Sequence, residues 1–386
     1  MVSRKVLFVT TVPSTIRAFL LPFAKHFRNM GWTVDAAAAG IGSFDECVEV
    51  FDNVWEIQWS RNLLDLNNLF DAPKAIQEIV QQEGYDLVHV HTPVAAFVTR
   101  WALRKVRRNN KLKVIYTAHG FHFIKGAPFY KNLVFIILEK LAGNWTDYLV
   151  VINKDDQEAA LKYRIIKKAN LLYMPGIGID SAYFDPNLIS ENDLNEVRDE
   201  IGLDENDRYF LMVAEFNNNK NQAEAVKALH KLNNQSIHIV FAGTGSTMAT
   251  VKELSEHLEI SDRVHFLGYR NDIPRLIKGS IALLLTSRRE GLPRCILESM
   301  SLEVPVIATN IRGTRELLAD GVGIVYRAGD VEGLKNAMEY VIHNPVEAQE
   351  MGRRGRKKII EKYELKKIIQ MHEDLYYRAL KDNRVD

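Results

Sequence analysis

Hydrophobic positions along this chain alternate between short apolar runs and longer stretches in which apolar residues recur at helical spacing. In the first half, the short runs predict strands at residues 6–10, 33–39, 54–57, 87–91, 114–117 and 148–152. The stretches of helical spacing predict helices at residues 16–30, 72–82, 94–108 and 129–141. Strands and helices that alternate in this order form a parallel sheet with helices on both faces.

The alternation stops once and then restarts. Glycine and proline interrupt it between residues 174 and 186, and we place a linker there. Further strands are predicted at residues 209–214, 237–241, 264–267, 281–286 and 305–309. We therefore expect an α/β protein with two doubly wound, Rossmann-like domains at residues 1–178 and 187–365, and a last helix at about 366–386 that packs back on the first. Ligands of such sheets bind at the carboxyl ends of the strands, which predicts a site in a central cleft that both domains face.

Composition narrows the class of protein. The chain has 386 residues, of which 47% are hydrophobic and 26% charged, and this fits two ordinary domains. Its net charge of +1 gives no indication of nucleic-acid binding. Its two cysteines, Cys47 and Cys295, argue for a reducing compartment rather than a disulfide framework. No apolar run approaches the ~20 residues that span a bilayer, and the start lacks a signal-peptide pattern, so we expect a cytoplasmic protein.

Residues 281–300 combine features of a binding site. A polar loop follows the predicted strand, and Pro293 suits the first position of the next helix because its missing N–H costs nothing there. Glu290 lies in the loop, and Glu298 lies about one turn into the helix. A helix N-terminus attracts anions and carboxylates accept hydrogen bonds from hydroxyls, so these features together fit a sugar nucleotide. The alternative is that Glu290 only supports the helix start and Glu298 is a solvated helix residue.

Other predicted strand ends carry further candidates. Lys220 precedes a helix, where it would carry its charge to a diphosphate or be an ordinary solvated lysine. Residues 242–246 form a glycine turn that lacks the third glycine of a dinucleotide fingerprint, which favours a tight turn over NAD binding. Tyr269 and Arg270 end another strand, where a nucleotide base would lie against the backbone, and Gly313 allows close backbone approach. Each of these last two segments is alternatively a plain loop.

In the first half, two strand ends carry polar side chains. Ser14 and Thr15 follow the first strand, where we expect them to be N-caps whose hydroxyls would also reach a phosphate. His119 and Gly120 follow a later strand, which places this histidine in the cleft rather than in the core. There it would be a hydrogen-bond donor or acceptor near neutral pH.

The histidines do not indicate a metal site. His89, His91 and His122 lie near His119 in the sequence, but their spacing matches no common zinc pattern and no cysteine is near. No Asp-x-Asp sequence occurs, which removes the simplest way for a sugar-nucleotide enzyme to hold a divalent ion. We therefore expect no metal, and no cofactor apart from the donor substrate.

Residues 100–113 are the most basic stretch, with seven basic residues and no acidic one. They predict either a solvated helix face with a loop or attraction to an anionic membrane, at about 1 kcal/mol per basic residue near the lipid. Residues 162–168 would add to this patch if they lie on the same side. The apolar run at 133–138 predicts a helix that is buried or interfacial.

Taken together, these residues resemble the retaining glycosyltransferases of family 4, which have the GT-B fold, over nearly the whole chain. The most specific element is Glu290 with Glu298 after seven residues, followed by residues 304–309. Residues 14–19 and 117–128 resemble bacterial enzymes that build capsule, exopolysaccharide or lipid-linked oligosaccharides. The resemblance implies a UDP-sugar donor, often an N-acetylhexosamine, and a polyprenyl-diphosphate-linked acceptor.

The resemblance also implies a role for each candidate residue. Glu290 would hold donor-sugar hydroxyls, Glu298 the ribose hydroxyls, and Lys220 would neutralise the leaving diphosphate. His119 would contact the transferred sugar and the reacting centre. The other donor contacts fall on Ser14, on the backbone of Gly291, Leu292, Arg294 and Cys295, and, for the base, on Tyr269 and Arg270.

Two positions depart from the family pattern. Glu215 stands where many relatives have an arginine, and Ser14-Thr15 stand where they have a glycine pair. The missing charge would then come from Arg288, Arg289 or Arg312. The resemblance implies metal-independent transfer with retention of configuration, in a cytoplasmic protein peripheral to the inner face of the cell membrane.

Two other functions would use a similar nucleotide site. A UDP-sugar epimerase of the GT-B fold would need no acceptor, and would release epimerised sugar from the donor alone. A non-catalytic nucleotide-sugar-binding protein would transfer sugar to no acceptor at all.

Overall fold

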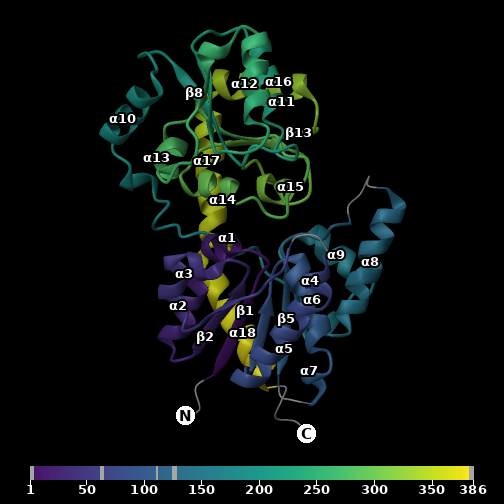
Figure 1. Cartoon of the computed structure of the whole chain (residues 1–386). Helices are drawn as coiled ribbons and strands as arrows, with labels where there is room; N and C mark the ends of the chain where they lie inside the picture. The colour runs from purple at the N-terminus through teal and green to yellow at the C-terminus, as the bar shows by residue number, and fades with distance from the viewer. Residues whose placement is uncertain (1–3, 61–64, 110–111, 124–127, 382–386) are drawn as a thin grey trace. The chain divides into compact units, whose positions relative to one another are not determined.

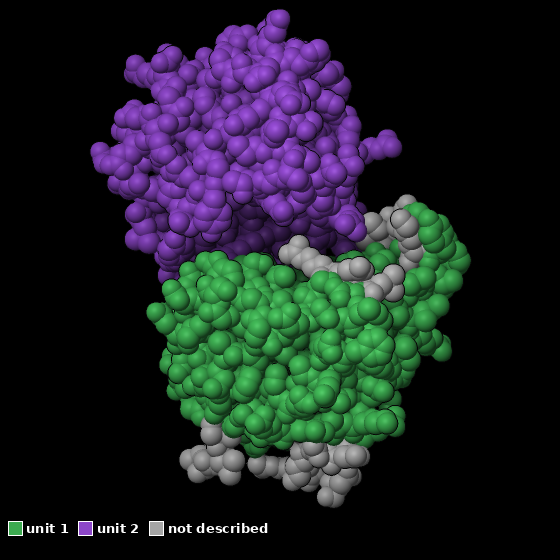
Figure 2. All heavy atoms as spheres, viewed as in Figure 1, with its two compact units in different colours: residues 1–177, 366–386 green, residues 178–365 purple. Residues whose placement is uncertain are grey.

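The computed structural model of the chain describes residues 4–60, 65–109, 112–123 and 128–381. The chain divides into two compact units, which Figure 2 shows in different colours. Unit 1 contains residues 1–177 and 366–386, and unit 2 contains residues 178–365. Each unit is built on a parallel sheet with connecting helices, so the expected α/β, doubly wound class is confirmed.

Unit 1 contains a seven-stranded parallel sheet in the order β3-β2-β1-β4-β5-β6-β7. Its strands are β1 (Lys5–Val9), β2 (Thr33–Ala38), β3 (Val54–Glu56), β4 (Leu87–Val90), β5 (Lys113–Ala118), β6 (Tyr148–Val151) and β7 (Leu171–Tyr173). The strand order reverses at β1, which pairs with β2 on one side and with β4 on the other. The loops after β1 and β4 therefore flank the position where open sheets of this kind bind ligands.

Helices connect the strands of unit 1 (Figure 1). They are α1 (Pro13–Thr15), the π-helical η1 (Ile16–Leu20), α2 (Leu21–Asn29), α3 (Asp45–Val50), α4 (Leu66–Leu69), α5 (Asp71–Glu83), α6 (Pro93–Leu103), α7 (Val106–Asn109), α8 (Phe129–Gly143) and α9 (Lys154–Lys162). The final helix, α18 (Leu365–Lys381), joins unit 1 from residue 366 onward. Its Tyr376 is buried and stacks on Phe27 of α2, with the ring centres 4.7 Å apart.

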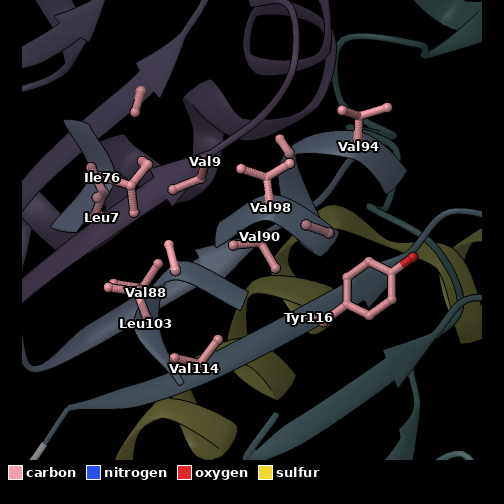
Figure 3. Packing of buried hydrophobic residues seen from close by; sticks show 14 of the residues in the cluster. Leu7, Val9, Ile76, Val88, Val90, Val94, Val98, Leu103, Val114 and Tyr116 are labelled. Atoms are coloured by element: carbon pink, nitrogen blue, oxygen red, sulfur yellow. The ribbon is translucent and has the colours of Figure 1, made fainter. Parts of the chain in front are cut away.

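The core of unit 1 lies between the sheet and the helices α5 and α6 (Figure 3). Strand residues such as Val88, Val90 and Val114 are fully buried, as expected for a parallel sheet covered on both faces. Ile76 of α5 and Val98 of α6 belong to the same cluster. This packing fixes the strand ends from which the polar loops emerge.

Unit 2 contains a six-stranded parallel sheet in the order β10-β9-β8-β11-β12-β13. Its strands are β8 (Arg208–Val213), β9 (Ile237–Ala242), β10 (Val264–Phe266), β11 (Leu283–Leu285), β12 (Val306–Thr309) and β13 (Ile324–Tyr326). The order reverses at β8, which pairs with β9 and with β11. The loops after β8 and β11 are therefore neighbours, although about seventy residues separate them along the chain.

The helices of unit 2 follow the strands in turn (Figure 1). They are α10 (Glu191–Ile201), α11 (Gln222–Lys231), α12 (Met248–His257), α13 (Ile273–Lys278), α14 (Arg294–Ser301), α15 (Thr314–Leu318), α16 (Val331–His343), α17 (Pro345–Lys358) and the π-helical η6 (Ile359–Tyr363). The core includes fully buried Leu283 and Leu285 of β11 and Ile296 of α14.

The sequence pattern misses several elements for physical reasons. β7 and β13 have three residues each, and strands this short show a hydrophobic period poorly, although the equally short β3, β10 and β11 were predicted. The helices α9 and α10 are polar, so apolar spacing does not reveal them. For α10, the sequence signal is a capping box in which Ser190 and Asp193 bond reciprocally.

Two expected helix starts are wrong, by three residues and by one. Ser14 is not an N-cap, because α1 begins at Pro13 and Val12 occupies its cap position; Thr15 occupies the cap position of η1, but its side chain makes no capping hydrogen bond there. Pro293 is the N-cap of α14 rather than its first residue, and its backbone is extended. The glycine turn after β9 is tight, as expected, since a Cβ at Gly243 would lie 2.1 Å from the Ala214 carbonyl oxygen.

Candidate functional site

The loops after β8 and β11 in unit 2 are locked together by hydrogen bonds. The Arg288 amide donates to the Asn219 carbonyl over 2.8 Å, and the Asn219 side-chain amide donates to the Arg289 carbonyl over 3.0 Å. The Thr286 hydroxyl donates to the Lys220 carbonyl over 2.7 Å. The two loops therefore form one rigid surface at the reversal point of the sheet.

Lys220 and Glu290 meet on this surface. Lys220 Nζ lies 2.6 Å from Glu290 Oε1, and the two side chains are only 22% and 12% exposed. Burial alone would lower the pKa of the Lys220 ammonium, but Glu290 and the other negative groups around it together outweigh burial, so the pKa lies above its usual value. A persistent positive charge therefore sits beside a carboxylate at the carboxyl end of the sheet.

The helix that follows supplies a second carboxylate. Glu298 is buried one turn into α14, where Arg294 Nε donates to its Oε1 over 2.8 Å. Burial raises the pKa of Glu298, while Arg294 acts in the opposite direction. Arg294 and Cys295 are the first two residues of α14, so their amides lie in the turn whose N–H groups have no acceptor within the helix. Burial raises the pKa of the Cys295 thiol to about 12, so this thiol is no nucleophile near neutral pH.

The loop after β12 closes the same surface. A Cβ at Gly313 would lie 2.3 Å from the Gly291 carbonyl oxygen, and Gly313 has a φ of +83°, so the predicted close backbone approach is confirmed. Arg312 Nε is 3.5 Å from the Glu290 carbonyl oxygen. Of the three arginines suggested to replace the cation missing at Glu215, Arg312 therefore has its guanidinium beside the Glu290 backbone.

Three further candidate residues of unit 2 remain: Glu215 lies near Lys220, and Tyr269 and Arg270 follow β10. Glu215 is exposed and its carboxylate accepts from the Asn217 side chain over 3.2 Å, so it adds negative charge near Lys220. Arg270 forms ion pairs with Asp272 and Glu200, which hold its pKa above the usual range, and Tyr269 is exposed. Among the described residues, its ion-pair partners Glu200 and Asp272 both lie outside the loops after β8 and β11.

Sequence reasoning missed Asn217 and Asn219, which shape the Lys220 loop. The Asn217 side-chain oxygen accepts from the amides of Asn219 and Lys220, each over 3.0 Å. The run of three asparagines before Lys220 is the signal, because asparagine favours such turns.

In unit 1, the loops after β4 and β5 bring histidines together. His91 Nδ1 lies 3.2 Å from His119 Nε2, and Phe19 of η1 stacks on the His119 ring at 6.0 Å. Burial lowers the pKa of His119 to about 4 and that of His91 well below its ordinary value. Both rings are therefore neutral at physiological pH. Ser14 is exposed in α1, after β1.

Within the described ranges, no group of three His, Cys, Asp or Glu side chains is arranged to hold a metal ion. His89 and His91 are adjacent, with ring centres 4.2 Å apart, but their nitrogens face other partners or none. His122 is exposed and lies against Phe135 of α8.

Comparison with known proteins decides the family. Residues 193–358 match the family model described as glycosyl transferases group 1, and residues 18–175 match the model described as glycosyltransferase family 4. The protein of Bacillus subtilis strain 168 that is named as the glycosyltransferase EpsD is 35% identical over 377 residues, which are 97% of this chain and 96% of EpsD. The chain belongs to glycosyltransferase family 4.

Further relatives of this family 4 glycosyltransferase carry more specific names. The UDP-Gal:alpha-D-GlcNAc-diphosphoundecaprenol alpha-1,3-galactosyltransferase of Escherichia coli is 29% identical over 309 residues, 78% of each chain. The crystal structure of Anabaena Alr3699/HepE in complex with UDP and glucose has a TM-score of 0.81 at 21% identity, over 97% of this chain and 100% of that one. The expected GT-B fold is thus confirmed.

The glycosyltransferase has an exposed apolar helix face in unit 1. α8 lies beside α6 (Figure 1), and its Phe135 and Ile136 pack on the core. Phe129 is 80% exposed and Ile137 is 55% exposed. Four more exposed apolar residues complete this outer face, namely Tyr130, Leu133, Val134 and Leu141. We call these six residues the α8 face. The helix predicted as buried or interfacial is therefore buried on one side only.

The basic stretch of this glycosyltransferase is partly structural. Arg100 is buried, pairs with Glu139 of α8 at 3.1 Å and lies over the Tyr116 ring. Arg107 pairs with Asp147 at 2.8 Å. Lys105 and Arg108 are exposed, so the solvated charge is smaller than the sequence suggests. In the described part of the chain, no helix has the length and apolar character needed to cross a bilayer.

Proposed function

We propose that this glycosyltransferase moves a sugar, which we take to be an N-acetylhexosamine, from a UDP-sugar to a polyprenyl-diphosphate-linked saccharide. The transfer is metal-independent, retains the anomeric configuration and serves bacterial surface polysaccharide synthesis. The observation that carries the proposal is the Lys220–Glu290 pair, at 2.6 Å, on the loops that flank the reversal point of the unit 2 sheet.

The arrangement of charges supports a nucleotide-sugar donor. Lys220 and the first turn of α14 provide a positive point charge and oriented amides, which suit a diphosphate. Glu290 and Glu298 provide carboxylates, which accept hydrogen bonds from the hydroxyls of a hexose and a ribose. Relatives lend weight to uridine: the Escherichia coli relative is named for UDP-Gal, and the Anabaena structure contains UDP.

The proposed mechanism needs little covalent chemistry from the protein. As the glycosidic bond of the donor breaks, negative charge accumulates on the leaving diphosphate. Lys220 and the α14 amides stabilise that charge in a preorganised position, which is the largest single contribution in many enzymes. Arg312, beside the Glu290 backbone, is placed to add a second cation. The acceptor hydroxyl then attacks from the face that the leaving phosphate occupied and passes its proton to that phosphate, which retains the configuration.

In unit 1, His119 supplies the contact to the transferred sugar. Its ring is neutral at physiological pH because burial lowers its pKa to about 4. A neutral imidazole can hydrogen-bond a sugar hydroxyl without adding charge beside the developing oxocarbenium-like centre. The family resemblance suggests this role for His119, and its half-buried side chain leaves part of the ring accessible to a ligand.

We expect uridine nucleotides to stabilise the wild-type protein against heat. Ligand at 100 times its Kd adds about 2.7 kcal/mol of stability, which corresponds to a shift of roughly 5–10 °C in a domain of this size. A thermal-shift screen with UDP, UDP-N-acetylglucosamine, GDP-mannose and ADP-glucose measures it. The Glu298→Gln variant should lose most of the shift, because it weakens the ribose contact. A shift with guanosine or adenosine compounds alone contradicts the donor assignment.

The epimerase alternative makes a different prediction. With UDP-sugar and no acceptor, an epimerase converts the sugar, whereas the proposed transferase returns it unchanged. Product analysis by NMR of the donor alone, and then of the donor with a polyprenyl-diphosphate-linked saccharide, separates the two.

We further propose that the α8 face docks on a membrane of anionic lipid, where a lipid-linked acceptor resides. Its apolar side chains offer area to the acyl boundary, and the one acidic residue of α8, Glu139, is turned inward to Arg100. Exposed Lys140 on α8 and the nearby Lys105 and Arg108 add attraction to anionic headgroups.

We expect the wild-type protein to sediment with phosphatidylglycerol-containing vesicles and the Val134→Glu/Ile137→Glu variant to bind them at least about tenfold more weakly. The control is Val346→Glu, because Val346 is an exposed apolar residue of unit 2. Equal binding by all three proteins, or no wild-type binding, rules out the α8 face as the docking surface.

A further inference from the structure

Four histidines lie together beneath the carboxyl ends of β4 and β5, and we call them the histidine cluster. They are His89, His91, His119 and His372. The ring centres of His89 and His91 are 4.2 Å apart, and those of His91 and His119 are 5.5 Å apart. His372 comes from α18, and its ring centre is 5.8 Å from that of His89.

All four rings are neutral near pH 7, because burial lowers the pKa of each. A neutral imidazole has one nitrogen that donates and one that accepts. The role of one nitrogen in a ring therefore fixes the role of the other. For His89 both nitrogens have a hydroxyl partner, since its Nε2 lies 2.7 Å from Thr117 Oγ1 and its Nδ1 lies 2.6 Å from the Tyr376 hydroxyl.

His91 is different, because among the described residues only one of its nitrogens has a partner. His91 is 2% exposed and its Nδ1 lies 3.2 Å from His119 Nε2, whereas no described residue offers a hydrogen-bond partner to its buried Nε2. Two tautomers are open to it. If Nδ1 donates, the unpaired Nε2 is a bare lone pair; if Nδ1 accepts, the unpaired Nε2 carries a buried N–H. Orphaned buried N–H groups are the rarer case in proteins, so the first tautomer is favoured.

We propose that His91 is a positioning residue for His119: it donates its Nδ1–H to His119 Nε2 and thereby fixes the rotamer and tautomer of that ring. His119 then carries its own hydrogen on Nδ1, which has no hydrogen-bond partner among the described residues. Nδ1–H becomes the ring atom that His119 offers to a ligand. His119 therefore acts as a hydrogen-bond donor toward the ligand, because its other nitrogen, Nε2, already accepts from His91.

The surroundings hold His91 in place for this task. The His91 amide donates to the Val9 carbonyl over 3.0 Å. Its ring packs against the rings of His89 and Phe8, whose centres are 4.2 and 5.9 Å away. Phe19 stacks on the other partner, His119, so both rings of the pair are confined. A ligand contact held by packed neighbours keeps its geometry without reorganisation during the reaction.

The catalytic part of this inference rests on the proposed function, in which His119 contacts the donor sugar. We expect His91→Phe, which keeps the ring but removes both nitrogens, to lower kcat by about 10–100-fold with a smaller change in the donor KM. His91→Asn should recover most of the loss, because the asparagine Nδ2 lies as many bonds from Cα as the histidine Nδ1. His372→Phe is the matched control, since the His372 Nδ1 bonds its own helix at the Ile368 carbonyl.

Nitrogen-15 NMR of histidine-labelled full-length protein without ligand tests the tautomer directly. The wild-type and His91→Asn proteins should show His119 protonated on Nδ1, and His91→Phe should show a mixture of both forms. A His119 proton on Nε2 in the wild type overturns the proposal, as does an Asn variant no better than Phe. If the tautomer is as expected but His119→Ala keeps full activity, the positioning contact stands and the assigned role of His119 fails.

Discussion

Replacing Lys220 with methionine should lower kcat/KM by about 100–1,000-fold, the loss typical of removing one preorganised group that stabilises transition-state charge. In the free protein, the same change removes the ammonium group that lies 2.6 Å from the Glu290 carboxylate, and the Glu290 side chain is only 12% exposed. Most of the loss should appear in kcat, because the leaving diphosphate carries more negative charge in the transition state than in the bound donor.

The chain contains a closely matched control for this variant. Lys335 and Glu339 of α16 also lie 2.6 Å apart, and Lys335 is 22% exposed, as Lys220 is. Lys335→Met should leave kcat/KM within about twofold of wild type, since ion pairs of this kind contribute little to stability. Steady-state kinetics with the donor identified by thermal shift measure both variants. A loss below about threefold for Lys220→Met would remove Lys220 from the mechanism.

Replacing Gly313 with alanine should destabilise unit 2 by about 2–5 kcal/mol. One part is the left-handed backbone at a φ of +83°, which costs a residue with a Cβ about 1–2 kcal/mol. The other part is the collision of that Cβ with the Gly291 carbonyl, 2.3 Å away, which must push the Glu290 loop aside. Donor affinity should therefore fall together with stability.

Gly329 separates the two parts of this effect. Its φ is also +83°, but a Cβ there would meet nothing within 4 Å. Gly329→Ala should cost only the backbone part, about 1–2 kcal/mol, and leave donor binding unchanged. Urea unfolding of both variants, followed by fluorescence with and without UDP, gives the comparison. Equal destabilisation by the two variants would show that the contact with Gly291 contributes nothing to the loss of unfolding free energy.

Much of the fold follows from local pattern. The alternation of apolar runs and helical spacing predicts both sheets, because buried parallel strands and amphipathic helices each have a characteristic hydrophobic period. It does not predict the polar helix α10, and it places Ser14 at a helix cap that Val12 occupies. Helix ends depend on one or two backbone angles, which leave almost no trace in the hydrophobic pattern.

The candidate site was predictable only in part. The spacing of Glu290 and Glu298 puts one in a loop and the other on the following helix, which is a local relation. The partner of Glu290 is not local, since Lys220 comes from a loop seventy residues earlier. Arg270 also has a distant partner, since it pairs with Glu200 as well as with its near neighbour Asp272, and the base contact suggested for it stays a prediction.

The sequence by itself determined the two doubly wound units, the polar loops at their strand ends and the two glutamates around α14. Only the tertiary structure decided that Lys220 meets Glu290, that His91 meets His119, and that α8 keeps an apolar face exposed. The physical reason is that hydrophobic period fixes what each segment becomes, whereas strand order fixes which loops are neighbours. Strand order depends on how all the segments pack together, and no single stretch of sequence contains it.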